Sequence, residues 1–202
     1  YALFVVTGRR FGDATLAPLE KLFSGMVWEN GAVLYHPTTD SIYLPFGRVN
    51  PRLVEALAAA GVPLELGRAI VSTRNAYSET VSRVLSDWVG HAVVTQDGER
   101  LRILPPGAAK GTGLERLLAL CGYSPRNLVS LGDGEQDPSL LQLAETGVIV
   151  ADAVRAVHEL ADLVAHQPGP TGAMETLEAL WLGEGLERAR RVWQRGNVIP
   201  LG

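Results

Sequence analysis

The segment Asn127–Asp137, with the sequence NLVSLGDGEQD, places the strongest constraint on how this chain can fold. It opens with the apolar run Leu128–Leu131, which is too short for a helix and is bounded by residues typical of turns. Such a run predicts a buried strand of a parallel sheet. Two carboxylates follow it, Asp133 in a Gly-Asp-Gly turn and then Asp137. Because open α/β sheets bind ligands beside the carboxyl ends of their strands, this turn is a candidate binding site.

Carboxylates in this position suit a hard divalent cation. Mg²⁺ is the natural candidate, because it takes one or two protein oxygens and completes its octahedron with water and phosphate oxygens. Gly and Asp are also common in a turn that does no more than end a strand. The segment alone favours neither interpretation, so the rest of the chain has to decide.

The bulk composition limits the possible partners. With 202 residues, 47% hydrophobic and 20% charged, the chain fits a globular domain that carries a smaller inserted one. A net charge of −4 provides no general basic field, so nucleic acid is not expected as a partner. The four arginines within Arg188–Arg195 are expected along a solvated helix face. Since no apolar run approaches the roughly 18 residues of a membrane span, and Ala2–Val6 is too short for a signal peptide, we expect a cytoplasmic protein without a membrane partner.

The single cysteine, Cys121, excludes a disulfide framework within the chain and a zinc site built from several cysteines. It falls within the apolar periodicity of a predicted helix. We therefore expect a buried, unreactive thiol.

A second candidate site lies near the start of the chain. Tyr1–Val6 predicts a strand that stops at Thr7-Gly8-Arg9, ahead of a helix predicted over Ala14–Phe23. The Thr7 hydroxyl would then lie at the carboxyl end of a strand, beside free backbone N–H groups, which is an arrangement that suits a phosphate oxygen. For this triplet alone, a Thr-Gly turn without a ligand is the simpler interpretation.

The pattern of elements changes between about residues 45 and 105. Helices are predicted over Asn50–Ala60 and Tyr77–Trp88, and strands over Leu64–Thr73, His91–Thr95 and Glu99–Leu104. This set predicts a small α+β subdomain at 45–105, inserted between core segments 1–44 and 106–195. Residues 196–202 are expected to be a linker or the start of a further domain beyond Gly202.

A lysine begins the first predicted helix after this insertion, within Ala108–Cys121. Lys110 places a positive charge at a helix N-terminus, where it opposes the helix dipole. Such a lysine either has a functional reason or is an ordinary surface residue. Further on, we predict a helix over Pro138–Glu145, strands at Gly147–Val150 and Leu163–Val164, a loop at Gly169–Gly172 and a helix from about Met174.

Three polar features therefore follow one another: a hydroxyl after a strand, a lysine at a helix start and paired acids after a later strand. Together they supply donors for phosphate oxygens, a fixed cation and metal-binding carboxylates, which are the requirements of phosphoryl transfer. This order resembles the haloacid dehalogenase (HAD) superfamily of phosphatases. Its second, third and fourth motifs are similar to FVVTGR at Phe4–Arg9, AAKGTGL at Ala108–Leu114 and LGDGEQD at Leu131–Asp137. The phrase ENGAVLY at Glu29–Tyr35 resembles the Cof-like branch, whose α/β cap is inserted between the second and third motifs.

The resemblance implies an α/β fold, with a Rossmannoid parallel sheet, helices on both of its faces and a small inserted α+β cap. It implies a Mg²⁺-dependent phosphatase that acts on a small phosphorylated metabolite, such as a sugar phosphate, through an aspartyl-phosphate. The implied phosphate-binding residues are Thr7, Gly8, Asn30 and Lys110. Asp133 would ligate Mg²⁺, with Asp137 on the metal or on its water shell, and the catalytic set would be Thr7, Lys110, Asp133 and Asp137. Candidate substrate contacts from the cap are Arg68, Arg74 and Tyr77.

One motif of the superfamily has no counterpart in the printed sequence. DxDGT carries the aspartate nucleophile, whereas Asp13 lies after the second motif and Asp152 lacks both the second acid and the Gly-Thr. Because Tyr1 begins where the second strand of the superfamily would start, we expect a first core strand and its nucleophile loop to be missing from this chain. The residues present would then bind Mg²⁺ and phosphate without turnover.

Two other interpretations stay open. The chain could be a non-catalytic binding or regulatory domain that has lost the nucleophile. It could also be a receiver-like or nucleotide-binding α/β domain, but AAKGTG lacks the earlier glycine and the spacing of a P-loop.

Overall fold

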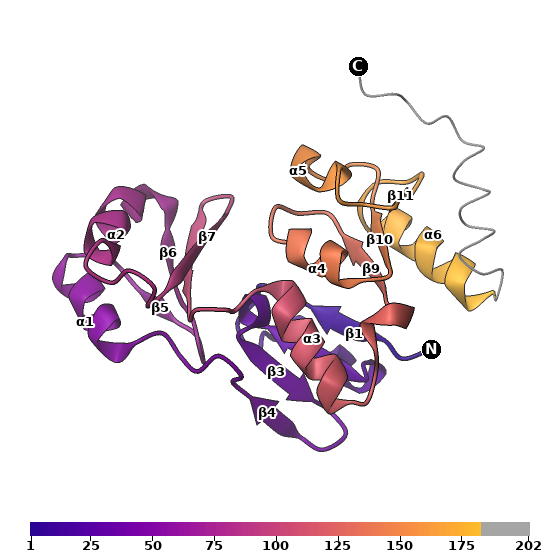
Figure 1. The fold of residues 1–202 in the computed structure, drawn as a ribbon, viewed down its shortest axis with the longest axis horizontal. Coiled ribbons are helices and arrows are strands. Elements are labelled where there is room, and N and C mark those ends of the chain that lie inside the picture. Colours follow the sequence, from indigo (N-terminus) through magenta and orange to yellow (C-terminus); the bar gives the residue numbers. More distant parts are fainter. Residues whose placement is uncertain (183–202) are drawn as a thin grey trace. The chain divides into compact units, whose positions relative to one another are not determined.

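The computed structural model describes residues 1–182 (Figure 1). They divide into two compact units between Tyr123 and Ser124. Three predictions lie outside the described residues: the linker or further domain at 196–202, the solvated helix face at Arg188–Arg195 and the end of the core segment 106–195. Among residues 1–182, no helix is both long and apolar enough to cross a lipid bilayer.

The first unit contains a four-stranded mixed sheet in the order β1-β2-β3-β4. Its strands are β1 (Phe4–Val6), β2 (Gly25–Trp28), β3 (Val33–His36) and β4 (Ser41–Tyr43). β1 pairs with β2 in parallel, and the remaining pairs are antiparallel. Helix α3 (Lys110–Leu120) packs against β2 and β3, so the apolar side chains of these central strands are buried.

The connection between β1 and β2 differs from the prediction. In place of a helix over Ala14–Phe23, the chain forms only the 3₁₀ helix η1 (Ala17–Leu22), and none of its residues is buried. The Thr15 N–H donates to Asp13 Oδ1 at 2.9 Å, so a turn occupies the predicted first residues. A short helix that buries no apolar face gains too little to be extended.

A second sheet of the first unit is antiparallel throughout and has the order β5-β6-β8-β7. We call it the insert sheet. Its strands are β5 (Glu65–Leu66), β6 (Val71–Arg74), β7 (Val93–Asp97) and β8 (Arg100–Leu104), and its helices are α1 (Pro51–Ala59) and α2 (Ser78–Leu85). Leu53, Val81 and Ile103 share one buried cluster between the helices and one face of this sheet. The predicted cap at Asn50 is confirmed, because its Oδ1 accepts the Arg52 N–H at 3.0 Å.

The strand predicted over Leu64–Thr73 is wrong. The chain instead turns back on itself between β5 and β6, which pair as an antiparallel hairpin. The Gly67 N–H donates to the Ile70 carbonyl at 2.9 Å and closes the turn. A carboxylate from a distant part of the chain stabilises this turn, as described below, and no local sequence pattern reveals it.

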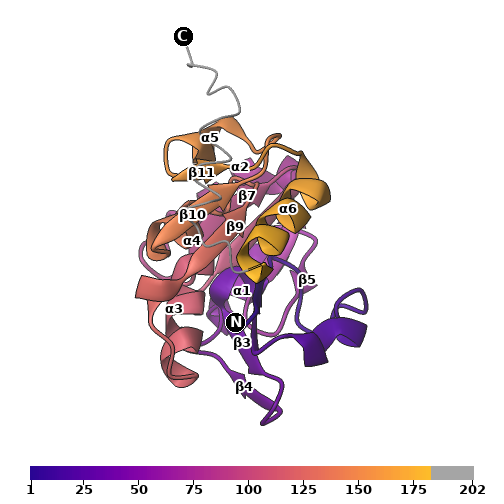
Figure 2. The ribbon, with the colours of Figure 1, turned by 90° about the vertical axis from the view of Figure 1, so that its right-hand side faces the viewer.

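The second unit contains a parallel sheet in the order β11-β10-β9. Its strands are β9 (Val129–Gly132), β10 (Thr146–Ile149) and β11 (Leu163–Val164), and its helices are α4 (Pro138–Leu143), α5 (Arg155–His158) and α6 (Gly169–Trp181). Ile149 packs with Leu141 of α4, whereas the adjacent Val148 packs with Ala179 of α6. Because successive residues of a strand face opposite sides, the two helices cover opposite faces of the sheet (Figure 2).

Helix α6 begins earlier than predicted. The segment Gly169–Gly172, expected to be a loop, forms its first turn. Proline is compatible with the first turn of a helix, because the N–H that it lacks would have no partner there. A Cβ on Gly172 would lie 2.1 Å from the Gln167 carbonyl oxygen, so glycine permits close packing rather than ending the helix. The α/β class predicted from the sequence is confirmed.

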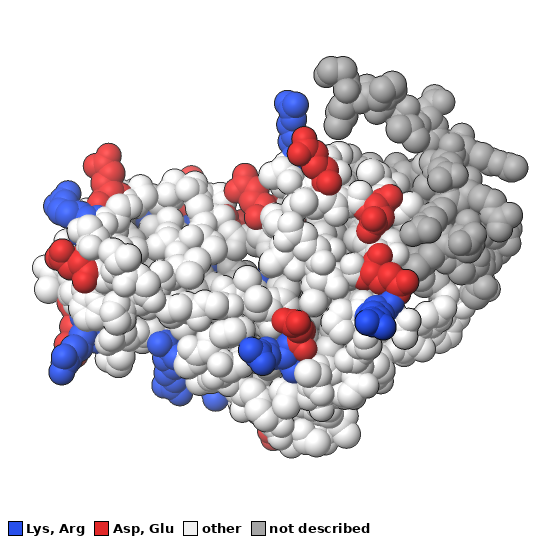
Figure 3. Space-filling view, viewed as in Figure 1, with Lys and Arg blue, Asp and Glu red and all other residues white. Residues whose placement is uncertain are grey.

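Charged side chains are scattered over the surface. Figure 3 shows acidic and basic residues on one face of the described part of the chain without a continuous patch of either sign. Several basic groups pair with acids, as Arg100 does with Glu65 at 3.2 Å. Such exposed pairs contribute little stability.

Candidate functional site

Thr7 lies directly after β1, at the carboxyl end of that strand. Its N–H continues the ladder by donating to the Val27 carbonyl at 2.8 Å, and its carbonyl accepts the Asn30 N–H at 3.1 Å. Its Oγ1 accepts the Arg9 N–H at 3.1 Å, which closes the turn after the strand. Backbone and side chain therefore fix the Thr7-Gly8-Arg9 turn on the end of the sheet.

Gly8 and Asn30 are packed closely against each other. A Cβ on Gly8 would lie 2.5 Å from Asn30 Oδ1, so no larger residue fits without moving the amide. Asn30 belongs to the 3₁₀ turn η2 (Glu29–Gly31), has a φ of 53° and is 2% exposed. Asparagine tolerates this left-handed backbone better than most residues. The structure thus brings together three predicted site residues, Thr7, Gly8 and Asn30.

The start of α3 packs directly on η2. Gly31 has a φ of +100°, and a Cβ there would lie 1.9 Å from the Ala109 carbonyl oxygen. A Cβ on Gly113 would lie 2.5 Å from the Gly31 Cα. Two glycines therefore allow the backbones to meet. Their contact places Lys110, the first residue of α3, beside the turn that carries Asn30.

The first turn of α3 is fixed without a capping side chain at position 109. The Thr112 hydroxyl accepts the Ala109 N–H at 3.0 Å and donates to the Gly107 carbonyl at 2.7 Å. Ala109 itself carries no side-chain oxygen to cap the helix. Thr112 satisfies polar groups that would otherwise be left open at the helix start and so fixes the position of Lys110.

Glu29 is a structural residue of this site that sequence reasoning missed. It is fully buried, and its carboxylate accepts four backbone N–H groups. Oε1 accepts from Phe11 at 3.2 Å and Arg68 at 2.8 Å, and Oε2 accepts from Ala69 at 2.8 Å and Ile70 at 3.1 Å. One side chain thereby connects η2, the segment after Thr7 and the turn between β5 and β6. The one sequence signal that could have drawn attention to Glu29 is its position directly before Asn30 and Gly31.

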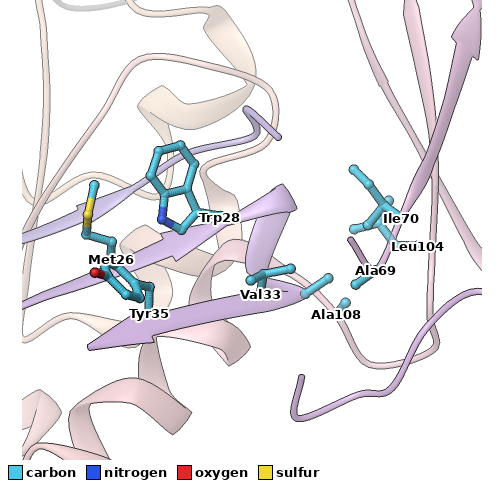
Figure 4. Close-up of a cluster of buried hydrophobic side chains, with 9 residues drawn as sticks. Met26, Trp28, Val33, Tyr35, Ala69, Ile70, Leu104 and Ala108 are labelled. Atoms are coloured by element: carbon cyan, nitrogen blue, oxygen red, sulfur yellow. The ribbon is translucent and has the colours of Figure 1, made fainter. Parts of the chain in front are cut away.

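A hydrophobic cluster surrounds this connection. Figure 4 shows Trp28 and Val33 of the first sheet on one side, and Ile70, just before β6, with Leu104 of β8 on the other. Ala108, just before α3, belongs to the same cluster. The connection from β8 to α3 therefore belongs to the same hydrophobic cluster as the strands on either side of η2.

The predicted contacts from the insert have different environments. The Arg68 guanidinium lies 4.8 Å from the centre of the Phe11 ring, a cation–π contact. Arg74 is exposed at the end of β6, opposite Arg100. Tyr77 packs against the hydrophobic cluster below α1 and α2. A residue that was not predicted, Arg102 of β8, lies against Gly8, with its Cζ 3.4 Å from the position of a Cβ on that residue.

Asp133 and Asp137 lie in the second unit, on the loop after β9. Asp137 is 3% exposed, and its Oδ2 accepts the N–H groups of Asp133 and Gly134, both at 2.9 Å. Asp133 is exposed, and its carboxylate forms no hydrogen bond or ion pair within residues 1–182. Asp137 therefore shapes the loop, while Asp133 presents its oxygens to solvent.

This donor set fits Mg²⁺ better than a metal enclosed by protein ligands. Within residues 1–182, no group of three or more His, Cys, Asp and Glu side chains is arranged to hold a metal ion. Mg²⁺ typically uses one or two carboxylates and keeps several waters, and one exposed carboxylate on an ordered loop can satisfy this need.

Comparisons with known proteins point to one family of hydrolases. The sequence profile of haloacid dehalogenase-like hydrolases matches residues 60–175. The chain is 28% identical over 188 residues to phosphoglycolate phosphatase 2 of Saccharolobus solfataricus, covering 91% of this chain and 78% of that protein. It is 30% identical over 165 residues to the phosphoglycolate phosphatase of Natronomonas pharaonis, covering 76% and 72%. The fold matches a crystal structure of a haloacid dehalogenase-like hydrolase from Bacteroides thetaiotaomicron with a TM-score of 0.74 and 18% identity, covering 89% of this chain and 86% of that one.

Proposed function

Because the chain belongs to the haloacid dehalogenase-like hydrolase family, we propose that it carries the phosphate- and Mg²⁺-binding parts of a phosphatase for a small phosphorylated metabolite. The observation that carries this proposal is the packing of Thr7, Gly8 and Asn30 with the first turn of α3. The names of the curated relatives support a phosphate monoester as the substrate. A sugar phosphate stays a prediction.

The residues of the first unit would bind the phosphoryl group. Thr7 Oγ1 already accepts the Arg9 N–H, so its own proton is available for a phosphoryl oxygen. Gly8 has no side chain to block an anion from the backbone. Asn30 would add a polar contact, and the Lys110 ammonium would balance the negative charge.

Mg²⁺, when bound, would neutralise charge on the phosphoryl oxygens. Asp133 is the proposed ligand, since its carboxylate is exposed and has no partner among residues 1–182. Asp137 would fix the loop through its bonds to backbone N–H groups. Whether Asp137 also contacts the metal or its water shell stays a prediction.

The segments of the chain would have the roles that the resemblance to the superfamily implies. Residues 45–105 would serve as the cap and the flanking segments as the core. The printed sequence has no DxDGT segment to supply the nucleophile. We therefore propose that this chain, as printed, binds phosphate with Mg²⁺ but does not turn over. The same absence fits a second candidate, a non-catalytic binding or regulatory domain.

The test is a calorimetric titration of the 202-residue chain with inorganic phosphate, with and without Mg²⁺. Phosphate should bind more tightly with Mg²⁺. Asp133→Asn should remove this difference, because it removes the proposed ligand charge. Glu135→Gln is the matched control, because Glu135 is an exposed acid of the same loop, and it should leave the difference unchanged.

A parallel assay uses p-nitrophenyl phosphate as a substrate. The printed chain should release no nitrophenol above background. Phosphate binding that ignores Mg²⁺ would contradict the proposed metal site. Turnover that is lost in Asp133→Asn would contradict the proposal that this chain lacks its nucleophile.

A further inference from the structure

The guanidinium of Arg102, on β8, is buried on the side of the insert sheet opposite to α1 and α2. Its neighbours Leu101 and Ile103 point toward those helices and belong to their hydrophobic cluster. Because strand residues alternate between faces, Arg102 points to the other side. Its side chain is nevertheless only 10% exposed. Arginine is seldom buried to this extent unless it is paired.

The guanidinium lies against the proposed phosphate turn. Its Cζ is 3.4 Å from the position of a Cβ on Gly8. Ser72 of β6 and Thr95 of β7 lie directly opposite Arg102 on the neighbouring strands. The Thr95 Oγ1 is buried and has no hydrogen-bond partner within residues 1–182. A buried hydroxyl without a hydrogen-bond partner costs free energy. The Thr95 hydroxyl beside Arg102 is therefore free to form a hydrogen bond to a ligand.

The charge of Arg102 is only partly compensated. Its Nη1 donates to Asp97 Oδ2 at 2.8 Å, and the Asp97 side chain is 57% exposed. A guanidinium has five N–H donors, and within residues 1–182 this is the one hydrogen bond that the Arg102 side chain makes. The remaining donors form the planar fork that matches a carboxylate bidentately.

We propose that Arg102 binds a carboxylate of the substrate, so that the substrate is a small phosphate monoester with a carboxylate close to its phosphate. This inference rests on the proposed function, because it takes the phosphate to bind at Thr7 and Gly8. The short distance between Arg102 and Gly8 restricts the linker to a few bonds. A sugar phosphate, whose sugar carries no carboxylate, would leave the guanidinium without this partner.

The test compares dissociation constants of the 202-residue chain for related ligands in the presence of Mg²⁺. The probes are 2-phosphoglycolate, its carboxylate-free analogue 2-hydroxyethyl phosphate, glucose 6-phosphate and inorganic phosphate. The wild-type chain should bind 2-phosphoglycolate about tenfold or more tightly than the analogue without the carboxylate, as expected for a charge-assisted bidentate contact. Arg102→Gln should reduce this ratio to about one while the affinity for inorganic phosphate is retained.

Three further variants separate recognition from structure. Arg100→Gln is the matched control, because Arg100 lies on the same strand and face but is paired with Glu65 and is 57% exposed; the ratio should stay unchanged. Arg102→Lys keeps the charge without the fork and should give an intermediate ratio. Asp97→Asn removes the competing acid and should raise the ratio, which keeps the inference testable if Arg102→Gln does not fold.

The outcomes distinguish failure of the proposed function from failure of the carboxylate assignment to Arg102. If inorganic phosphate does not bind at all, the proposed function fails and this inference fails with it. If phosphate binds but the wild-type ratio is about one, or glucose 6-phosphate binds more tightly than 2-phosphoglycolate, only the carboxylate assignment is overturned. Equal loss of all ligands in a folded Arg102→Gln protein would also overturn it, because Arg102 would then contact the phosphate itself.

Discussion

At the scale of single residues, the carboxylate of Glu29 is the most consequential buried group of the first unit. It accepts four backbone N–H groups from segments that are distant in sequence. Asp137 does the same for a loop of the second unit with two N–H groups. Both acids accept several backbone N–H groups at once and so fix the backbone of the segments that they bind.

We predict that Glu29→Gln lowers the free energy of unfolding by about 3 kcal/mol, because charge-assisted bonds are replaced and the amide NH₂ faces backbone donors. Urea denaturation of the whole chain measures this change. Glu65→Gln is the control, because Glu65 is also a paired acid but is 52% exposed, and it should cost less than about 1 kcal/mol. Equal effects of the two substitutions would show that the buried carboxylate contributes no more than a surface acid.

At the scale of elements, the contact between η2 and α3 fixes the position of Lys110, the first residue of α3. It depends on Gly31 and Gly113, whose lack of side chains lets the backbones touch. Both the positive φ of Gly31 and the absence of space around it exclude other residues.

We predict that Gly31→Ala destabilises the protein by more than about 3 kcal/mol, because a Cβ would overlap the Ala109 carbonyl in addition to straining the backbone. Gly61→Ala isolates the strain alone, since Gly61 has a φ of +79° and no atom lies within 4 Å of the position that its Cβ would take. That control should cost about 1 to 2 kcal/mol. Thermal unfolding of both variants gives the comparison, and similar midpoints would contradict the proposed role of the contact.

Elements were predictable from the sequence wherever local rules decide them. The cap at Asn50 and the Asp97-Gly98 turn follow from short-range chemistry. The break between β5 and β6 does not, because the carboxylate that stabilises it comes from Glu29, some 40 positions earlier in the chain. Helix α6 was predicted to begin too late because glycine and proline can also form the first turn of a helix.

At the scale of the whole molecule, the α/β class and the order of the motifs were accessible from the sequence, because strand and helix periodicities alternate along the chain. Thr7 and Gly8 both contact Asn30, although some 20 residues separate them from it in sequence. Arg102 was missed because a lone arginine inside a strand pattern usually faces solvent. Its burial depends on packing against the Thr7 turn, which no local pattern encodes.

The net charge also gives an expectation for the whole molecule. With a formal charge of −4, the chain should not bind polyanions through general electrostatics. Fluorescence anisotropy of a labelled DNA duplex should stay unchanged on addition of the protein at about 150 mM salt. A signal that rises with protein and falls steeply with salt would contradict this expectation and reveal a local basic surface.

The partners of Glu29 have a consequence for how such a protein can diversify. Three of them are backbone N–H groups of the turn at residues 68–70, and every amino acid except proline provides such a group. The exposed position 68 can therefore change its side chain without loss of the attachment between the turn and η2. The side chain at this position can therefore vary over generations while the backbone attachment of the turn is inherited unchanged.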